Sequence, residues 1–241
     1  MFKDNLELEK ERLENISIDF SMKTGFNGRL EKYRSLTMKE NIHGDNILDV
    51  ACADGFMAQE LSKYFKHITA IDGSEKLINE AKKLNLKNVD FVCTLFEEYN
   101  PEKKFDSILL CDILEHVNNP LDLLEKSSEW VKDDGVILIL CPNANSIHRQ
   151  IGVLAGMMKD IHELNETDKR VGHRRVYDIE LLKKDINASN LKIIKWGGVF
   201  LKPLSNNQMD QLDNKVVDAF YSIGKNLPPE LLTEIYVKCE K

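Results

Sequence analysis

The sequence predicts an α/β fold in which a mostly parallel, doubly wound sheet carries helices on both faces. Between residues 46 and 141, short aliphatic and β-branched runs alternate with longer amphipathic segments, a pattern typical of β-α-β units. The 241 residues include 42% hydrophobic side chains, which is enough for one large domain with a sizeable core. A turn of small residues, ACADGF, directly follows the first aliphatic run. Together these observations exclude a disordered or fibrous chain.

Each element is predicted from its local pattern. Aliphatic runs predict strands at 46–51, 67–71, 89–92, 107–111, 136–141, 191–196 and 234–239. Apolar residues near helical spacing, such as Leu121, Leu124 and Val131, predict helices at 55–64, 75–84, 120–131 and 179–190. The alternating charges and leucines of LELEKERLEN predict a further helix over 1–14.

Two polar stretches, 142–177 and 199–230, interrupt this rhythm. Loops longer than ~12–15 residues usually carry function or form a lid, so we expect both stretches to be helical insertions around an acceptor site. Residues 1–42 are expected to form an N-terminal helical cap. The simplest organisation is a single domain over 1–241.

Composition narrows the functional classes. The 33 basic and 40 acidic residues give a net charge of −7 and are interspersed, which argues against a nucleic-acid-binding surface. The five cysteines form no C-x-x-C pair, which fits a reducing, cytoplasmic environment. The N-terminus lacks the apolar segment of a signal peptide, and the longest apolar stretch, 136–141, is far shorter than the ~20 residues of a membrane-spanning helix. We expect a soluble protein without membrane partners, as a monomer or a homodimer.

The segment ILDVACADGF carries the sharpest functional signal. Small residues at the turn let backbone N–H groups approach a ligand, and the following helix N-terminus favours negative charge. The next strand ends in Asp72, about 20 residues after the turn, where a carboxylate can accept both hydroxyls of an adenosine ribose.

With these motifs the sequence resembles the class I S-adenosylmethionine (SAM)-dependent methyltransferases. VCTLFEEY is similar to the family's segment beside the adenine, FDSILLCDILEHV to its fourth strand and following loop, and VKDDGVILILCPN to its fifth strand. The resemblance covers nearly the whole chain and implies a Rossmann-like sheet of about seven strands whose last strand is antiparallel. It implies SAM as cofactor, with S-adenosylhomocysteine (SAH) as product.

The resemblance also implies which residues hold the cofactor. Asp49 and the turn would lie under its methionyl and ribose parts, and Asp72 would bind the ribose. Tyr33 and Arg34 fall in a segment that the family often folds over the cofactor. The full set of expected cofactor residues is Tyr33, Arg34, Asp49, Ala51, Cys52, Ala53, Gly55, Asp72, Leu95, Phe96 and Cys111.

One departure from the family is that Ala51 and Ala53 stand where glycine is common. Either alanine would be strained if its φ were positive. A dinucleotide enzyme is the rival interpretation, although G-x-G-x-x-G is absent.

The acceptor is expected beyond the carboxyl ends of the strands, enclosed by the insertions. SIHR and GHRRVYD suggest an anionic acceptor, because arginine binds phosphate or carboxylate bidentately. The alternative is that these arginines form ion pairs with neighbouring acids or cap helix C-termini. The candidate acceptor-binding residues are Arg149, Arg174, Arg175 and Tyr177.

The resemblance and the HR-containing segments point to an O-methyltransferase for a small anionic or nucleotide- or sugar-linked acceptor. The overall pattern looks like bacterial enzymes that tailor surface glycans, phosphonates or phosphoramidates. An ionised oxygen would need no general base, whereas a sugar or quinone-type hydroxyl would, and His116, His148 and His173 are the candidates. A protein or RNA methyltransferase and a SAM-binding scaffold without turnover are further alternatives.

We expect no metal. Catechol-type members of the superfamily chelate a cation with acids after the fourth and fifth strands, where this chain has Asp112 and Asn143. No second acid accompanies Asn143, and hard cations prefer several carboxylate oxygens.

Overall fold

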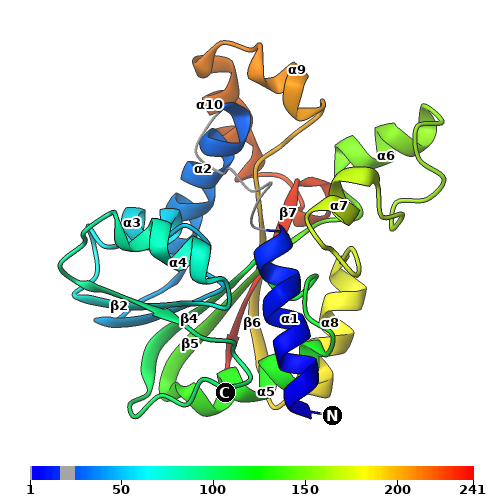
Figure 1. The fold of residues 1–241 in the computed structure, drawn as a ribbon. Coiled ribbons are helices and arrows are strands. Elements are labelled where there is room, and N and C mark those ends of the chain that lie inside the picture. Colours follow the sequence, from blue (N-terminus) through cyan, green and yellow to red (C-terminus); the bar gives the residue numbers. More distant parts are fainter. Residues whose placement is uncertain (1, 17–24) are drawn as a thin grey trace.

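A computed structural model describes residues 2–16 and 25–241. Seven strands form one sheet in the order β3-β2-β1-β4-β5-β7-β6 (Figure 1). The strands are β1 Asn46–Val50, β2 His67–Asp72, β3 Val89–Cys93, β4 Phe105–Cys111, β5 Val131–Pro142, β6 Lys192–Val199 and β7 Glu234–Glu240. Pairings among β1 to β5 are parallel, and β7 runs antiparallel to both β5 and β6. The predicted fold class is therefore confirmed.

Helices connect and cover these strands. They are α1 Phe2–Ile16, α2 Gly25–Asn41, α3 Phe56–Leu61, α4 Glu75–Lys82, α5 Pro120–Trp130, α6 Ile147–Leu154, α7 Glu166–Arg170, α8 Ile179–Ala188, α9 Asn206–Asp210, α10 Asn214–Gly224 and the 3₁₀ turn η2 Pro229–Leu231. Capping explains several starts: Ser74 accepts a hydrogen bond from the Leu77 N–H, and Asn119 precedes a proline at the first turn of α5. None of the helices within 2–16 and 25–241 is long and apolar enough to span a bilayer.

Alternating side chains of the central strands bury themselves in two separate cores. Ile108 and Leu110 of β4 pack with Leu124 of α5 and Leu182 of α8, whereas Leu109 belongs to the other core, beneath α2 and α3. This two-sided burial explains why the central strands are continuous apolar runs rather than alternating ones.

The structure corrects the start of the fifth strand, which was predicted at residue 136. Val131 already pairs with Phe105, and a register shift between Phe105 and Ser107 joins this pair to the regular ladder. Helix α5 accordingly ends at Trp130. The polar residues of KDDG concealed this extension because they resemble a turn.

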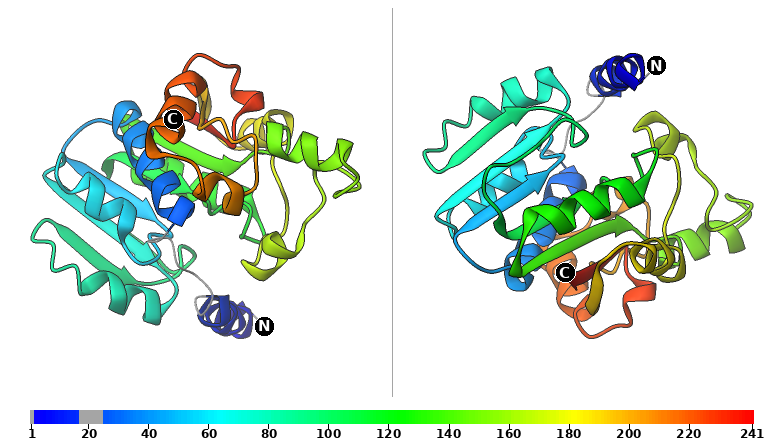
Figure 2. Two further views of the ribbon diagram at one scale, coloured as in Figure 1. Left: turned by 90° about the horizontal axis from the view of Figure 1, so that it is seen from above. Right: turned by 90° about the horizontal axis from the view of Figure 1, so that it is seen from below.

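The parallel strands β1, β2 and β4 end at one edge of the sheet, where the loops gather. The segment 142–177 holds α6 and α7 and projects from the body, and 199–230 holds α9 and α10 (Figures 1 and 2). Helix α1 lies beside this edge and is seen end-on at the margin of the molecule in Figure 2.

Candidate active site

The turn after β1 has a left-handed backbone at three residues. Ala51 has φ 62°, Ala53 has φ 47° and Gly55 has φ 79°. The Cys52 N–H donates to the Ile71 carbonyl, and the Gly55 N–H donates to the Cys52 carbonyl, so the loop is held in this shape. A side chain at Gly55 would also collide with Phe91, so glycine serves packing here. The two alanines therefore carry the strain expected of L-residues at positive φ.

We expect Ala51→Gly and Ala53→Gly each to raise the free energy of unfolding by about 1 kcal/mol, because glycine adopts this φ without steric cost. The measurement is urea unfolding followed by circular dichroism. Ala81→Gly is the matched control: Ala81 is buried in helix α4, and the change should lower stability by about 1 kcal/mol. Loss of stability in all three variants would contradict the strain argument.

Asp72 fastens the same turn from the end of β2. Its Oδ2 accepts a hydrogen bond from the Ala53 N–H at 2.9 Å, and its Oδ1 accepts one from the Ser74 N–H at 2.8 Å. The side chain is buried, and desolvation raises its pKa while these two donors oppose the shift. Both oxygens retain acceptor capacity toward the cavity that Asp72 lines.

That cavity, which we call the first cavity, has a volume of about 150 Å³. Its walls are mostly apolar and include the expected residues Leu95 and Phe96, both buried. The remaining polar wall includes Asp72, Thr94 and Glu97. An apolar slot with a carboxylate at one end suits a flat heterocycle joined to a polyhydroxyl ring.

Helix α1 covers the first cavity with Glu9, Arg12, Leu13 and Ile16. The Arg12 guanidinium donates to the carbonyls of Gly172 and His116, each at 3.4 Å, and Arg174 pairs with Glu9 at 3.3 Å. These contacts connect α1 to the loop after β4 and to the 142–177 segment, and so bring the predicted N-terminal cap against the site.

A second cavity of about 220 Å³ adjoins the first, and Ala51, Ala53, Asp112 and His116 line both. Its other polar lining includes Glu31, Arg34, Asp49, Asp54, Glu115 and His173, together with the predicted residues Cys52 and Cys111. Burial raises the pKa of both thiols, so each cysteine lines the cavity as a neutral thiol and not as a nucleophilic thiolate.

Asp49 is 2% exposed, and its Oδ2 has no hydrogen-bond partner within the described residues. Desolvation, followed by repulsion from Asp72 and Glu31, raises its pKa to about 7. A buried carboxylate without a partner is costly unless a ligand supplies a donor. Asp49 therefore marks a position for a positively charged or hydrogen-bond-donating group.

Arg34 is buried among three acids. It contacts Asp112 Oδ2 at 2.9 Å and also pairs with Glu31 and Glu234. Asp112 has φ 49°, and burial raises its pKa to about 8, opposed by Arg34. The predicted neighbour Tyr33 does not line either cavity: its hydroxyl donates to Asp218 Oδ1, and its ring stacks on Phe200 and Tyr221. The structure thus separates Arg34, at the cavity, from Tyr33, in the core.

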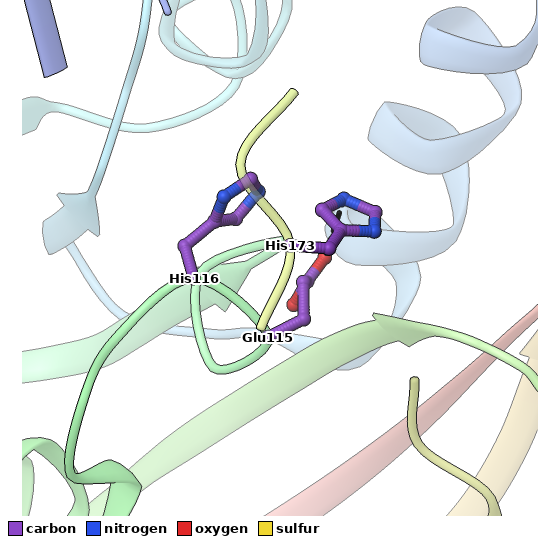
Figure 3. Close-up of side chains that lie close together, drawn as sticks. All are labelled: Glu115, His116 and His173. Atoms are coloured by element: carbon purple, nitrogen blue, oxygen red, sulfur yellow. Dashed lines mark ion pairs between the residues drawn. The ribbon is translucent and has the colours of Figure 1, made fainter. Parts of the chain in front are cut away.

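Glu115, His116 and His173 meet at the second cavity (Figure 3). His173 Nε2 lies 4.0 Å from Glu115 Oε1, and the two imidazoles make an edge-to-face contact with centroids 4.7 Å apart. Burial, followed by the charges of His173 and Arg12, lowers the pKa of His116 to about 3. His173 also approaches Asp168, with Nδ1 and Oδ1 3.4 Å apart. Of the predicted bases, His173 has the carboxylate neighbours that a proton acceptor needs.

The three candidate arginines have internal partners. Arg175 donates to the carbonyls of Leu114, Val117 and Asn118, and Arg174 donates to the His116 carbonyl. These bonds tie the GHRRVYD segment to the loop after β4, so the two arginines position that loop.

Arg149 is 5% exposed and binds the carbonyls of Ile161 and Glu163 and the carboxylate of Asp168. It lines neither cavity and stabilises the 142–177 segment from inside. Its predicted role as an acceptor ligand is therefore corrected. Arg149 and Arg174 make the internal ion pairs of the alternative interpretation, whereas Arg175 binds carbonyls only.

Two further predicted residues lie outside both cavities. Tyr177 is buried in the core, where its hydroxyl donates to Asp185 at 2.8 Å. Burial and then the charges of Lys202 and Arg149 lower the pKa of His148 to about 3. Tyr177 therefore packs in the core, and neither Tyr177 nor His148 lines either cavity. Asn143 likewise donates to carbonyls of the 229–232 segment instead of meeting Asp112.

Sequence reasoning missed Glu115, Glu31 and Glu234 as site residues. Glu115 stands beside His116 in LEHV, which was the available signal, but a glutamate at a loop is ordinarily exposed. Glu115, His116 and His173 also each place a potential ligand atom within 4.8 Å of the others. The expectation of no metal stays a prediction.

Comparison with known proteins agrees with this geometry. A family model described as a methyltransferase domain matches residues 25–195. The chain belongs to this methyltransferase-domain family. The match includes β1 to β5 and most of the residues that line both cavities.

Individual curated proteins match this chain at low sequence identity or over only part of its length. The chain is 34% identical over 116 residues to N-methyltransferase 4 of Papaver somniferum, covering 44% of this chain and 33% of that protein. It is 24% identical to the ubiquinone biosynthesis O-methyltransferase of Idiomarina loihiensis over 78% of this chain and 77% of that one. The chain spans only about a third of the length of several curated relatives that it matches.

Among solved structures, the plantazolicin methyltransferase BpumL in complex with a substrate analogue and SAH has a similar fold. Its TM-score is 0.62 at 21% identity, covering 99% of this chain and 97% of that one. A methyltransferase from Archaeoglobus fulgidus gives a TM-score of 0.60 at 18% identity, with 88% and 94% coverage.

Proposed function

We propose that this protein transfers a methyl group from SAM to a small-molecule acceptor. The adenosine part of SAM would lie in the first cavity against Asp72, Leu95 and Phe96, and the methionyl part in the second. The observation that carries the proposal is Asp49 Oδ2, which is buried in the lining of the second cavity and has no hydrogen-bond partner within the described residues, since a methionyl ammonium would supply the missing donor. Family membership supports the same function.

Bound SAM supplies an electrophilic methyl group on a positively charged sulfur. The chain contributes orientation and exclusion of water, which account for much of the rate of such a displacement. Helix α1 covers the first cavity and is tied by Arg12 to the loop that carries His116. With its lowered pKa, His116 is neutral and can position groups between the two cavities without taking up a proton.

The site favours an acceptor whose nucleophilic atom must lose a proton over an acceptor that is already ionised. An ionised, anionic oxygen was expected from Arg149, Arg174 and Arg175, but their donors are engaged with internal partners. An acceptor atom that gives up a proton to a nearby base, as in the hydroxyl alternative, is supported better than an ionised oxygen, because His173 lines the second cavity beside two carboxylates. The named relatives include both O- and N-methyltransferases.

The test is calorimetric titration with two ligands, SAH and 5′-methylthioadenosine, which lacks the amino-acid part. Wild type should bind both. We expect Asp49→Asn to weaken SAH about 10- to 100-fold, the range for losing a charge-assisted hydrogen bond, and to leave 5′-methylthioadenosine within twofold. Equal weakening of both ligands would contradict the placement of the methionyl group, and failure of folded wild type to bind SAH would defeat the proposed function.

A further inference from the structure

The second cavity has an excess of acidic groups. Its lining contains five carboxylates, from Glu31, Asp49, Asp54, Asp112 and Glu115. The one arginine of that lining is Arg34, and it already pairs with Glu31 and Asp112, as well as with Glu234 behind them. An anionic acceptor would meet repulsion here, whereas a cation would meet complementary charge.

Glu115 is the acid of this lining for which both carboxylate oxygens lack a hydrogen bond within the described residues. Its side chain is fully buried. The nearest basic nitrogen, His173 Nε2, is 4.0 Å away, beyond hydrogen-bond distance (Figure 3). Burying an unpaired carboxylate is costly, so such a group is normally either protonated or matched by a bound cation.

The cofactor does not account for Glu115. In the proposed function the methionyl ammonium would take Asp49 of β1 as its partner, and Asp72 is held by the turn on the first-cavity side. Glu115 lies on the loop after β4, next to His173 of the 142–177 segment, where the acceptor is expected. We propose, on the basis of the proposed function, that the acceptor nucleophile is an amine and that Glu115 accepts the proton of its ammonium form.

In this step one ammonium N–H bond breaks and the proton forms an O–H bond on Glu115. The nitrogen lone pair then forms a bond to the methyl carbon as the carbon–sulfur bond breaks, and that electron pair stays on sulfur. A hydroxyl acceptor would bring no positive charge and would leave Glu115 without a cation.

The charged groups around Glu115 determine its proton affinity. Asp112 of the same loop and Glu234 of β7 disfavour its ionised form, and Arg34 of α2 favours it. His116, His173 and the Cys141 thiol also face this region. Burial, the largest influence, raises the pKa of Glu115 well above its ordinary value and so favours the protonated form while the site is empty. Binding of an ammonium should therefore expel a proton.

The test uses SAH-saturated protein at pH 7.5 with EDTA and three probes of nearly equal size: benzylamine, benzyl alcohol and benzoate. Calorimetry is run in two buffers of different ionisation enthalpy, so that protons released on binding are counted. We expect benzylamine to bind at least tenfold more tightly than the other probes and to release about one proton. Glu115→Gln should remove both the preference and the proton release while binding SAH normally, and Glu129→Gln, an exposed change on α5, should retain both.

Several outcomes overturn the inference. These are equal affinity for the three probes, no binding of any probe, preference for benzoate, and unchanged proton release in Glu115→Gln. Each of them, with SAH binding intact, defeats the amine proposal alone. Absence of SAH binding in the wild type would instead defeat the proposed function.

Discussion

Replacing Asp72 with alanine is expected to lower the affinity for SAH by at least about 100-fold. Asp72 lines the first cavity, and two hydrogen bonds from ribose hydroxyls to a carboxylate would each contribute about 1.5–3 kcal/mol. The substitution also releases the Ala53 N–H, and with it the turn that Asp72 holds. Because 5′-methylthioadenosine retains the ribose, its affinity should fall by a similar factor, unlike in Asp49→Asn.

Asp90→Ala is the control for Asp72→Ala. Asp90 lies on the adjacent strand β3, and its side chain is 70% exposed. The Asp90→Ala variant should bind SAH with the affinity of the wild type. Asp72→Asn keeps the side-chain volume and one acceptor oxygen, so its affinity for SAH should lie between those of Asp72→Ala and the wild type. A thermal unfolding scan checks that each variant is folded. If folded Asp72→Ala bound SAH within threefold of the wild-type affinity, the proposed contact between Asp72 and the ribose would be contradicted.

The second large effect is expected in Arg34→Met, which should lose about 3–5 kcal/mol of unfolding free energy at pH 8. The change leaves Glu31, Asp112 and Glu234 without the cation that holds them together. For a domain of this size the corresponding fall in Tm is about 6–20 °C. Arg170→Met, an exposed change on α7, should stay within about 0.5 kcal/mol of wild type.

The cost of Arg34→Met should shrink as the pH falls from 10 to 5, and the part due to Asp112 should change mainly at and above pH 8. Burial raises the pKa of Asp112, to about 8 in the wild type, and that of Glu31, above the values of the unfolded chain. The folded state therefore binds more protons, and stability rises as pH falls, by up to about 1.4 kcal/mol per pH unit for each group. Without Arg34 these pKa values rise further. A cost that stays constant or grows toward pH 5, measured as the difference from wild type, would contradict this account.

The elements with strong local patterns were predictable. Continuous aliphatic runs mark β1, β2 and β4 because both faces of a central strand are buried. Val131 was not recognised as the start of β5, because the partner that makes it a strand residue, Phe105, lies on another strand. Local sequence contains no information about that pairing.

The candidate site was predictable only in part. Asp72 and the small-residue turn follow from the strand-turn-helix pattern, and the structure places them together through the Ala53 N–H. The arginines of 142–177 were predicted to bind a ligand because of their chemistry, yet Arg175 and Arg149 bind carbonyls. A guanidinium has the same donors for a carbonyl as for a phosphate, so its partner is decided by what the fold places nearby.

By itself, the sequence determined that this chain forms a doubly wound sheet with a small-residue turn and an acid at the end of the second strand, because these depend on periodicity and short spacing. Tertiary structure decided the electrostatics of the site. Arg34 meets Glu234 across 200 residues, Arg12 meets Gly172 across 160, and Glu115 loses all contact with solvent. Charge becomes costly or useful only when burial removes water, and burial depends on contacts between segments far apart in the chain.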